Sequence, residues 1–260
     1  MSVAIRWLNI LRMSTTPSDE TEAALPAGRP ALLVLVRHAE SERNVAKKGN
    51  RFFLDDESRK SVLGVADHRT ALTARGREQA LQTGAALREK FGVFDYAYHS
   101  GYNRTRETLD GLLGSYSEEE RARIRVRHHL FLRERDTGYT FDMTTAESEA
   151  AFPWLQDYWN TYGPLFGRPP GGESMADVAK RVYLFLSVLF RDRVGKRVLV
   201  VTHGGTIWMF RMLLERWTWE ETEEHFRTSN IRNCSVTHYA LDPRAGRLTL
   251  CALAKVHWAE

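Results

Sequence analysis

Unbroken apolar runs recur along the chain and predict the strands of a sheet. The two strongest runs, residues 31–36 and 197–202, are dominated by leucine and valine, as in strands that are buried on both faces. The segment DPRAGR has the Pro and Gly of a turn and predicts a hairpin with the apolar stretches that flank it. The hairpin strands are expected at 235–241 and 248–253, and two shorter strands at 95–99 and 125–131.

Helical spacing of apolar residues separates these predicted strands. Over residues 73–91 the pattern predicts a helix with Thr73 as its N-cap, and Gly92 ends it. Other helices are expected over 103–113, from Gly172–Ser174 through Leu189, and from Gly204 to about Glu215. Strands that alternate with helices predict an α/β fold, a three-layer α/β/α sandwich with a mostly parallel central sheet.

Length and composition limit the possibilities further. A chain of 260 residues with 43% apolar residues suits one large domain, expected at residues 31–260. The 37 basic and 33 acidic residues give a formal charge of +4, and no long Lys/Arg block occurs, which argues against nucleic acid as a partner. Cys234 and Cys251 are the only cysteines, so we expect no disulfide scaffold, no cysteine metal site and a cytoplasmic setting.

The first thirty residues have a different character from the rest. The segment MSVAIRWLNILRM is too short and too charged to span a membrane, and no small-residue cleavage pattern follows it. The Ser-, Thr-, Pro- and acid-rich segment after it predicts a flexible lead-in over residues 1–30. The abrupt change at Met13 suggests the hypothesis that Met13 is the native start.

Charged and polar residues follow three of the predicted strands. Arg37 and His38 end the first strand, Ser100 and Arg104 follow the second, and the sequence THGG at 202–205 ends the run RVLVVT. In parallel sheets, ligands bind beyond the carboxyl ends of the strands, where the next helix presents free N–H groups. If these strands are neighbours, two histidines and two arginines meet at one edge of the sheet.

Five motifs carry a resemblance to a known family. In chain order they are VRHAES with Asn44, SGYNRTRETL, LRERDTGY, PPGGES and VVTHGG. Together they are similar to the histidine phosphatase superfamily, in the branch that resembles phosphoglycerate mutase, and the likeness extends over about residues 32–241. The resemblance implies a three-layer α/β fold, a phosphohistidine intermediate, no metal and no other cofactor.

The resemblance also implies roles for the matched residues at the phosphate. His38 matches the nucleophile, and Arg37 and Arg104 match the two arginines of the phosphate pocket. Asn44 falls where the family has a phosphate-binding asparagine. Ala39 departs from the family pattern, because a glycine commonly follows the nucleophile, and this raises the question of how tight that turn is.

The remaining matches concern proton transfer and the second histidine. Glu134 matches the acid/base glutamate, which would protonate the departing alkoxide and then take a proton from water. Its charged neighbours Arg133, Arg135 and Asp136 are expected to form a solvated face. His203 matches the second histidine of the pocket, where with Gly204 it would contact the substrate.

Physical chemistry asks for the same residue types. A phosphate monoester carries close to two negative charges, and the guanidinium groups of Arg37 and Arg104 can each bind two of its oxygens. Attack by His38 requires a neutral imidazole in one tautomer, which a hydrogen bond to a backbone carbonyl would fix. His203 would be most useful as a cation beside the transition state, so we expect the two histidines to carry opposite charge states.

Residues 138–172 are expected to form a helical, aromatic cap insertion, and with the loop 49–70 they would set specificity. The only cation of this insertion is Arg168, whereas mutases of the family bind a second anionic group with cations placed there. This favours a metal-independent phosphomonoesterase whose small-molecule substrate has a bulky or partly apolar leaving group. The aromatic residues are Tyr139, Phe141, Phe152, Trp154, Tyr158, Trp159, Tyr162 and Phe166.

Two alternatives stay open. One is a cofactor-dependent phosphoglycerate mutase, and the other is a non-catalytic module that binds phosphate. The expected partners include no nucleic acid and no membrane, and a homodimer is left open.

Overall fold

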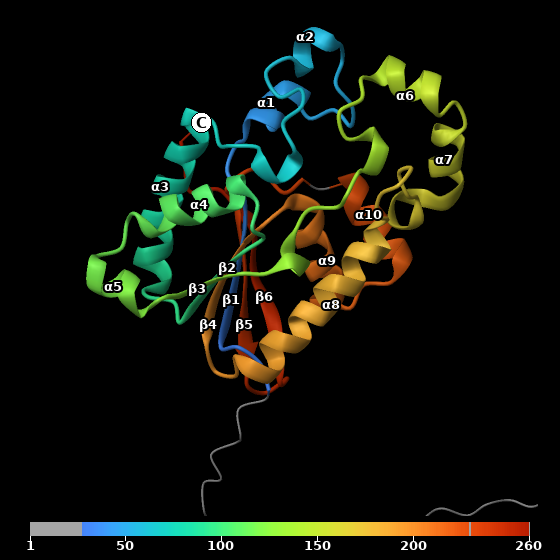
Figure 1. The fold of residues 1–260 in the computed structure, drawn as a ribbon. Coiled ribbons are helices and arrows are strands. Elements are labelled where there is room, and N and C mark those ends of the chain that lie inside the picture. Colours follow the sequence, from blue (N-terminus) through green and yellow to red (C-terminus); the bar gives the residue numbers. More distant parts are fainter. Residues whose placement is uncertain (1–27, 229, 260) are drawn as a thin grey trace, which may run out of the picture.

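Six strands form one sheet at the centre of the computed structural model, which describes residues 28–228 and 230–259 (Figure 1). The order across the sheet is β3-β2-β4-β1-β5-β6. The strands are β1 (Leu32–Arg37), β2 (Tyr96–His99), β3 (Arg125–His128), β4 (Arg197–Thr202), β5 (Val236–Asp242) and β6 (Arg247–Lys255). Except for residues 28–30, the expected lead-in lies outside the described residues, and so does the hypothesis about Met13.

The strand pairings confirm a mostly parallel sheet with an antiparallel hairpin at one side. Strand β4 pairs in parallel with both β1 and β2, and β3 extends the parallel part. Strand β5 pairs antiparallel with β1 and with β6. Arg37 lies opposite Thr202, and His99 lies opposite Val201, so the ends of β1, β4 and β2 are level. The three strand ends that carry polar residues are therefore neighbours, as the sequence predicts.

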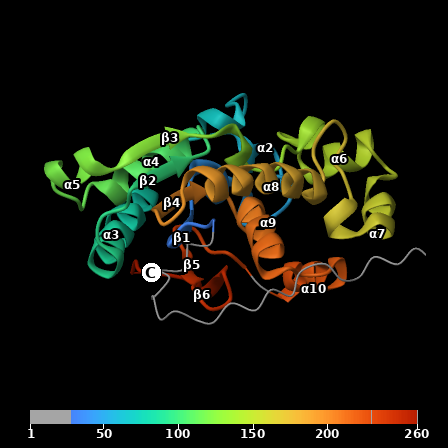
Figure 2. The ribbon, with the colours of Figure 1, turned by 90° about the horizontal axis from the view of Figure 1, so that it is seen from below.

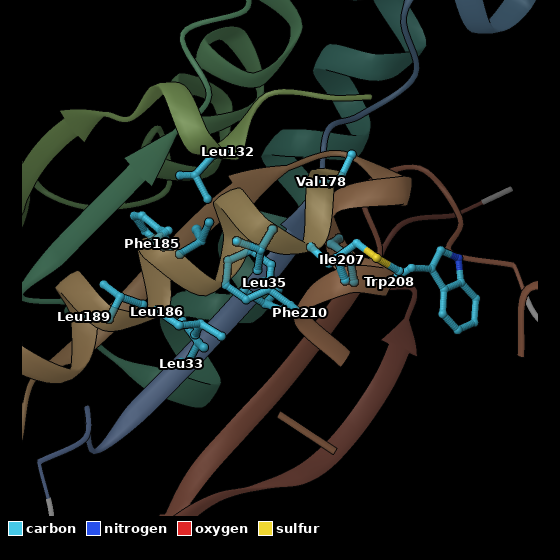
Figure 3. Packing of buried hydrophobic residues seen from close by; sticks show 14 of the residues in the cluster. Leu33, Leu35, Leu132, Val178, Phe185, Leu186, Leu189, Ile207, Trp208 and Phe210 are labelled. Atoms are coloured by element: carbon cyan, nitrogen blue, oxygen red, sulfur yellow. The ribbon is translucent and has the colours of Figure 1, made fainter. Parts of the chain in front are cut away.

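Alternate residues of the central strands are buried against helices on opposite faces, which confirms the three-layer arrangement. Leu33 and Leu35 of β1 belong to a cluster with α8 and α9, and Figure 3 shows both side chains directed toward these helices. Val34 and Val36 belong to a second cluster with α3 and α4. These helices are α3 (Ala74–Phe91), α4 (Asn103–Leu113), α8 (Met175–Asp192) and α9 (Gly204–Glu215).

Helices α1, α2, α6 and α7 lie beyond the carboxyl ends of the parallel strands (Figure 1). The insertion 138–172 contains η3, α6 and α7, and Figure 2 shows α6 and α7 on the side of the molecule away from α3 and α5. Within the described residues, no helix is long and apolar enough to cross a membrane. The shorter elements are α1 (Glu42–Lys47), α2 (Asp56–Arg59), η1 (Asp67–Arg69), α5 (Glu118–Arg123), η2 (Leu130–Leu132), η3 (Gly138–Thr140), α6 (Thr145–Ala151), α7 (Leu155–Phe166) and α10 (Trp219–Thr228).

The strand predicted over 125–131 is wrong in its second half. Strand β3 ends at His128, where its partner β2 ends at His99. Nδ1 of His129 then accepts a hydrogen bond from the backbone N–H of Phe131 at 3.3 Å, and this cap begins η2. A local side-chain bond therefore turns the chain where the strand loses its partner.

Candidate functional site

The backbone around His38 is held from two sides. Its N–H donates to the Thr202 carbonyl at 2.8 Å, which ties it to the end of β4. On the other side, its carbonyl accepts from the Cys234 N–H at 3.2 Å and from Asn233 Nδ2 at 3.0 Å. Cys234 has a left-handed backbone with φ of 53°, and its N–H also donates to the Arg37 carbonyl at 3.1 Å. These contacts fix the base from which the imidazole projects.

The imidazole of His38 is buried and oriented by one hydrogen bond. Its Nδ1 lies 2.8 Å from the Ala39 carbonyl, so Nδ1 carries the proton and Nε2 keeps its lone pair. Burial lowers the pKa of His38 well below its usual value, and the charges of Arg104 and Arg37 lower it further. A neutral imidazole in one tautomer is what the sequence predicts. The φ of Ala39 is not positive, so this turn does not require glycine.

His203 lies beside His38, at the N-terminal end of α9. The two ring centroids are 5.1 Å apart, and His203 is fully buried. Its Nε2 lies 2.9 Å from Ser100 Oγ, and its Nδ1 is buried without a hydrogen-bond partner among the described residues. Nδ1 is thus a buried polar atom without a partner, and it can donate to an oxygen acceptor only when it is protonated.

The expectation of opposite charge states for the two histidines is not met by the side chains of the protein itself. Burial lowers the pKa of His203 well below its usual value, and Arg104 lowers it further, as for His38. The physical reason is that both rings are buried beside the same guanidinium. A negative charge between them would be needed to favour a cationic His203.

The two arginines lie close to these rings but have different surroundings. Nη1 of Arg37 donates to the Ile231 carbonyl, and its Nε is buried with no partner in the described part of the chain. Arg104 extends from α4 and is only 5% exposed, and its two Nη atoms donate to the carboxylate of Asp67 at 2.9 and 3.2 Å. Neither this ion pair nor a role for Asp67 is predicted from the sequence pattern.

Asn44 is held by acceptor bonds at its side-chain oxygen. Its Oδ1 accepts from the Ser41 N–H at 3.2 Å and from Asn233 Nδ2 at 3.0 Å, which leaves the Nδ2 group as a donor. Asn233 therefore links Asn44 to the carbonyl of His38. Asn44 lines a cavity of about 270 Å³ together with Arg37, His38, Arg104 and Glu134.

Glu134 rests on the first turn of α9. Its Oε1 accepts from the Arg135 N–H at 2.9 Å, and its Oε2 accepts from the Gly205 N–H at 3.4 Å. A helix N-terminus favours a negative charge, so this position suits a carboxylate. At Gly204 a Cβ atom would be 3.7 Å from Arg37 Nε, which places this predicted substrate contact beside the Arg37 guanidinium.

A second cavity, of about 570 Å³, continues from the first past Glu134, Arg135 and Thr137, which line both. Trp159 and Arg51 line it too, with the Arg51 guanidinium 4.1 Å from the Trp159 ring centroid. Neither the Arg51 nor the Arg135 guanidinium has a carboxylate within 4.0 Å in residues 28–228 and 230–259. The larger cavity is thus partly aromatic and partly cationic.

Arg135, expected to be solvated, is half-buried and lines both cavities, and its burial there lowers its pKa. Arg168, the only cation of the insertion, pairs with Asp177 at 2.6 Å, which agrees with the expectation that the insertion itself offers little positive charge to a second anionic group. Arg51 lies outside the insertion 138–172, so the composition of the insertion gave no signal for it. Arg135 directly follows Glu134 in the charged run LRERD, so its place next to the predicted acid/base residue could have marked it as a candidate. In the described residues, no group of three or more His, Cys, Asp or Glu side chains is arranged to hold a metal ion.

Comparison with known proteins identifies sequences and folds that resemble this chain. The sequence model of the histidine phosphatase superfamily (branch 1) matches residues 33–253. A 2,3-bisphosphoglycerate-dependent phosphoglycerate mutase of Parvibaculum lavamentivorans is 31% identical over 220 residues, which cover 84% of this chain and 93% of that protein.

Phosphatases are also among the similar proteins. A broad-range acid phosphatase of Saccharomyces cerevisiae is 28% identical, over 85% of this chain and 89% of its own length. The structure of a mycobacterial glucosyl-3-phosphoglycerate phosphatase aligns with a TM-score of 0.62 at 24% identity, over 86% of this chain and 98% of that chain. The similar proteins therefore include both a mutase and phosphatases, and the structural match at 24% identity shows the shared fold.

Proposed function

Because the chain belongs to the histidine phosphatase superfamily, we propose that it is a phosphomonoester hydrolase that works through a phosphohistidine intermediate on His38. The observation that carries the proposal is the His38 imidazole, held neutral with its Nε2 lone pair in a cavity that Arg37 and Arg104 line. Neutral imidazole is the nucleophilic form, and guanidinium groups bind the phosphoryl oxygens.

The first step transfers the phosphoryl group to the enzyme. Nε2 of His38 forms a bond to phosphorus as the bond to the ester oxygen breaks, and Glu134 in its acid form gives its proton to the departing alkoxide. Glu134 lies where the two cavities meet, so it has access to an oxygen between the phosphate and the leaving group.

The second step regenerates the free enzyme. Glu134, now a carboxylate, takes a proton from water as the water oxygen attacks phospho-His38, and inorganic phosphate leaves. The phosphoryl dianion supplies the negative charge that a cationic His203 needs, so His203 would be protonated with the substrate bound. Its unpartnered Nδ1 would then donate to a phosphoryl oxygen.

The larger cavity supports a bulky, partly apolar leaving group on a small-molecule phosphate. Trp159 offers an aromatic face to such a group. Arg51 and Arg135 favour an alcohol that also carries a negative charge, because they lack carboxylate partners among the described residues. This observation supports phosphoglycerate mutase as the second candidate, since a mutase must hold two anionic groups. Both cysteines are free, which supports a reducing, cytoplasmic setting.

The test is hydrolysis of aryl and alkyl phosphates by purified protein with EDTA present. We expect turnover without added metal and an acid-labile phosphoenzyme, and His38→Ala should abolish both, with a rate loss of at least about a thousandfold. Efficient interconversion of 3-phosphoglycerate after priming with 2,3-bisphosphoglycerate would establish the mutase instead. Phosphate binding without turnover would identify a non-catalytic module.

A further inference from the structure

A carboxylate occupies the phosphate end of the site. Asp67 lines the same cavity as His38, and its side chain is 28% exposed. Its Oδ1 and Oδ2 accept from the Arg104 Nη atoms at 2.9 and 3.2 Å, and its carbonyl accepts from Nη1 at 2.7 Å. Three acceptors of Asp67 therefore engage the guanidinium that a phosphoryl group would use. A dianionic phosphoryl group and this carboxylate repel each other and bind the same donors.

Hydrogen bonds other than those of the Asp67 carboxylate also anchor the loop that carries it. The neighbouring Arg69 carbonyl accepts from Asn103 Nδ2 at 3.0 Å, which anchors η1 to the start of α4. Earlier in the loop, the Val65 carbonyl accepts from Arg43 Nη2 at 3.1 Å. The backbone carbonyl of Asp67 also binds Arg104 without help from the side chain. If the Asp67–Arg104 ion pair served only to hold this loop, we would expect the loop to lack these other hydrogen bonds.

From this geometry, and resting on the proposed function, we infer that Asp67 is a positioning residue that competes with phosphate for Arg104. Between turnovers its carboxylate holds the guanidinium in the cavity and balances its charge. When inorganic phosphate is the product, the same carboxylate retakes the Arg104 donors and weakens the retention of phosphate. Asp67 thus sets the balance between capturing the phosphoryl group and releasing the product.

The direction in which the affinity for inorganic phosphate changes in an Asp67 variant separates this role from a structural one. Asp67→Asn keeps the size of the side chain and the backbone contact but removes the negative charge. Competition predicts tighter binding of inorganic phosphate to the variant, by about tenfold for the loss of a partly buried opposing charge. A structural role predicts the reverse, because a disordered loop would release Arg104 and weaken binding.

The experiment is calorimetric titration of the full-length protein with inorganic phosphate. Asp142→Asn is a matched control, since Asp142 pairs with a buried arginine of the same cavity, Arg43, at 2.8 Å and its side chain is 32% exposed. We expect Asp142→Asn to change the affinity by no more than about threefold. Asp67→Ser, with a short uncharged side chain, repeats the test if Asp67→Asn does not fold.

Parallel hydrolysis assays separate this inference from the proposed function. If the wild type hydrolyses phosphate esters and the Asp67 variants bind phosphate no more tightly, the competition is disproved and the proposed function stands. If the variants bind phosphate more tightly and no protein hydrolyses esters, the competition stands and the proposed function fails. In an active enzyme we also expect the KM of Asp67→Asn to fall together with the phosphate Kd.

Discussion

Two adjacent glycines at the start of α9 differ in the space around them. A Cβ atom on Gly205 would lie 2.7 Å from Glu134 Oε1 and 3.2 Å from the terminal carbon of Met175. A Cβ atom on Gly204 would meet its nearest neighbour, Arg37 Nε, at 3.7 Å, an ordinary contact. The carboxyl group of Glu134 is therefore placed where only a glycine at 205 leaves it room.

This difference gives a prediction with a built-in control. Gly205→Ala should push the Glu134 carboxyl away from the helix terminus and lower kcat by about ten- to a hundredfold, because proton transfer depends on its position. Gly204→Ala adds its methyl group beside Arg37 rather than beside Glu134, so any effect should fall on KM, with kcat within about threefold of the wild type. Steady-state kinetics with an alkyl phosphate measures both, since a poor leaving group needs the proton. Equal losses in the two variants would contradict this placement of Glu134.

Some site residues could be predicted one by one, and others could not. His38, Arg37, Arg104 and His203 follow apolar strand runs directly or within a few residues, so pattern and topology bring them together. The Asp67–Arg104 pair depends on how a loop folds over the site, and no periodic pattern encodes that path. Arg51 reaches the larger cavity from another loop for the same reason.

At the scale of elements, α8 holds the segment that carries Glu134. Arg181 of α8 donates to the carbonyls of Phe131, Arg133 and Glu134 at 2.8, 2.7 and 3.1 Å. The carboxylate of Glu173 pairs with the same guanidinium at 3.0 Å. The buried guanidinium of Arg181 thus connects α8 to the segment that follows β3 and to the loop that precedes α8.

Removing this cation should destabilise the protein strongly. Arg181→Met keeps an apolar stem but removes the donor of the Phe131 and Glu134 carbonyls and the cation that pairs with Glu173, so we expect a loss of about 3 kcal/mol in the free energy of unfolding. Urea denaturation measures it. Lys180→Met is the control, because Lys180 is the next residue on the same helix and is 79% exposed. The two variants should differ clearly, and similar stabilities would rule out the role given to Arg181.

The elements themselves were unequally predictable. The long helices and the central strands were expected from apolar periodicity, which reflects burial on a defined face. Short elements such as α2 and η1 bury no residue, so no apolar periodicity predicts them. The second half of the predicted strand 125–131 failed because the length of the neighbouring strand β2 decides where pairing stops.

At the scale of the whole molecule, two fully enclosed imidazoles couple stability to pH. The folded-state pKa values of His38 and His203 are lowered, chiefly by burial, whereas in the unfolded chain both are near about 6.5. Above that pH these two histidines are unprotonated in both the folded and the unfolded state, so they do not lower the free energy of unfolding. Below that pH the unfolded chain binds protons at these histidines and the folded protein does not, so the free energy of unfolding falls as pH falls.

The expected loss is about 1.4 kcal/mol per pH unit for each of the two histidines below about pH 6.5. Urea denaturation at about pH 7.5 and about pH 5.5 measures the wild type and His203→Asn. Other partly buried histidines add to the slope in both proteins, so the difference between the two proteins reports His203. A variant with the same slope as the wild type would show that His203 takes up a proton in the folded state.

The strands that lead to His38 and to Glu134 have different numbers of neighbours in the sheet. Strand β1, which leads to His38, has β4 and β5 on either side, whereas β3, which leads toward Glu134, lies at the edge with a single neighbour and four exposed residues. Fraying begins at edges. Mild heat or denaturant would therefore loosen β3 first, and the proton donor would then depend on Arg181 while the nucleophile kept both neighbouring strands. If that hold also weakened, the enzyme would still accept phosphate from esters with good leaving groups yet be slow to free itself of it.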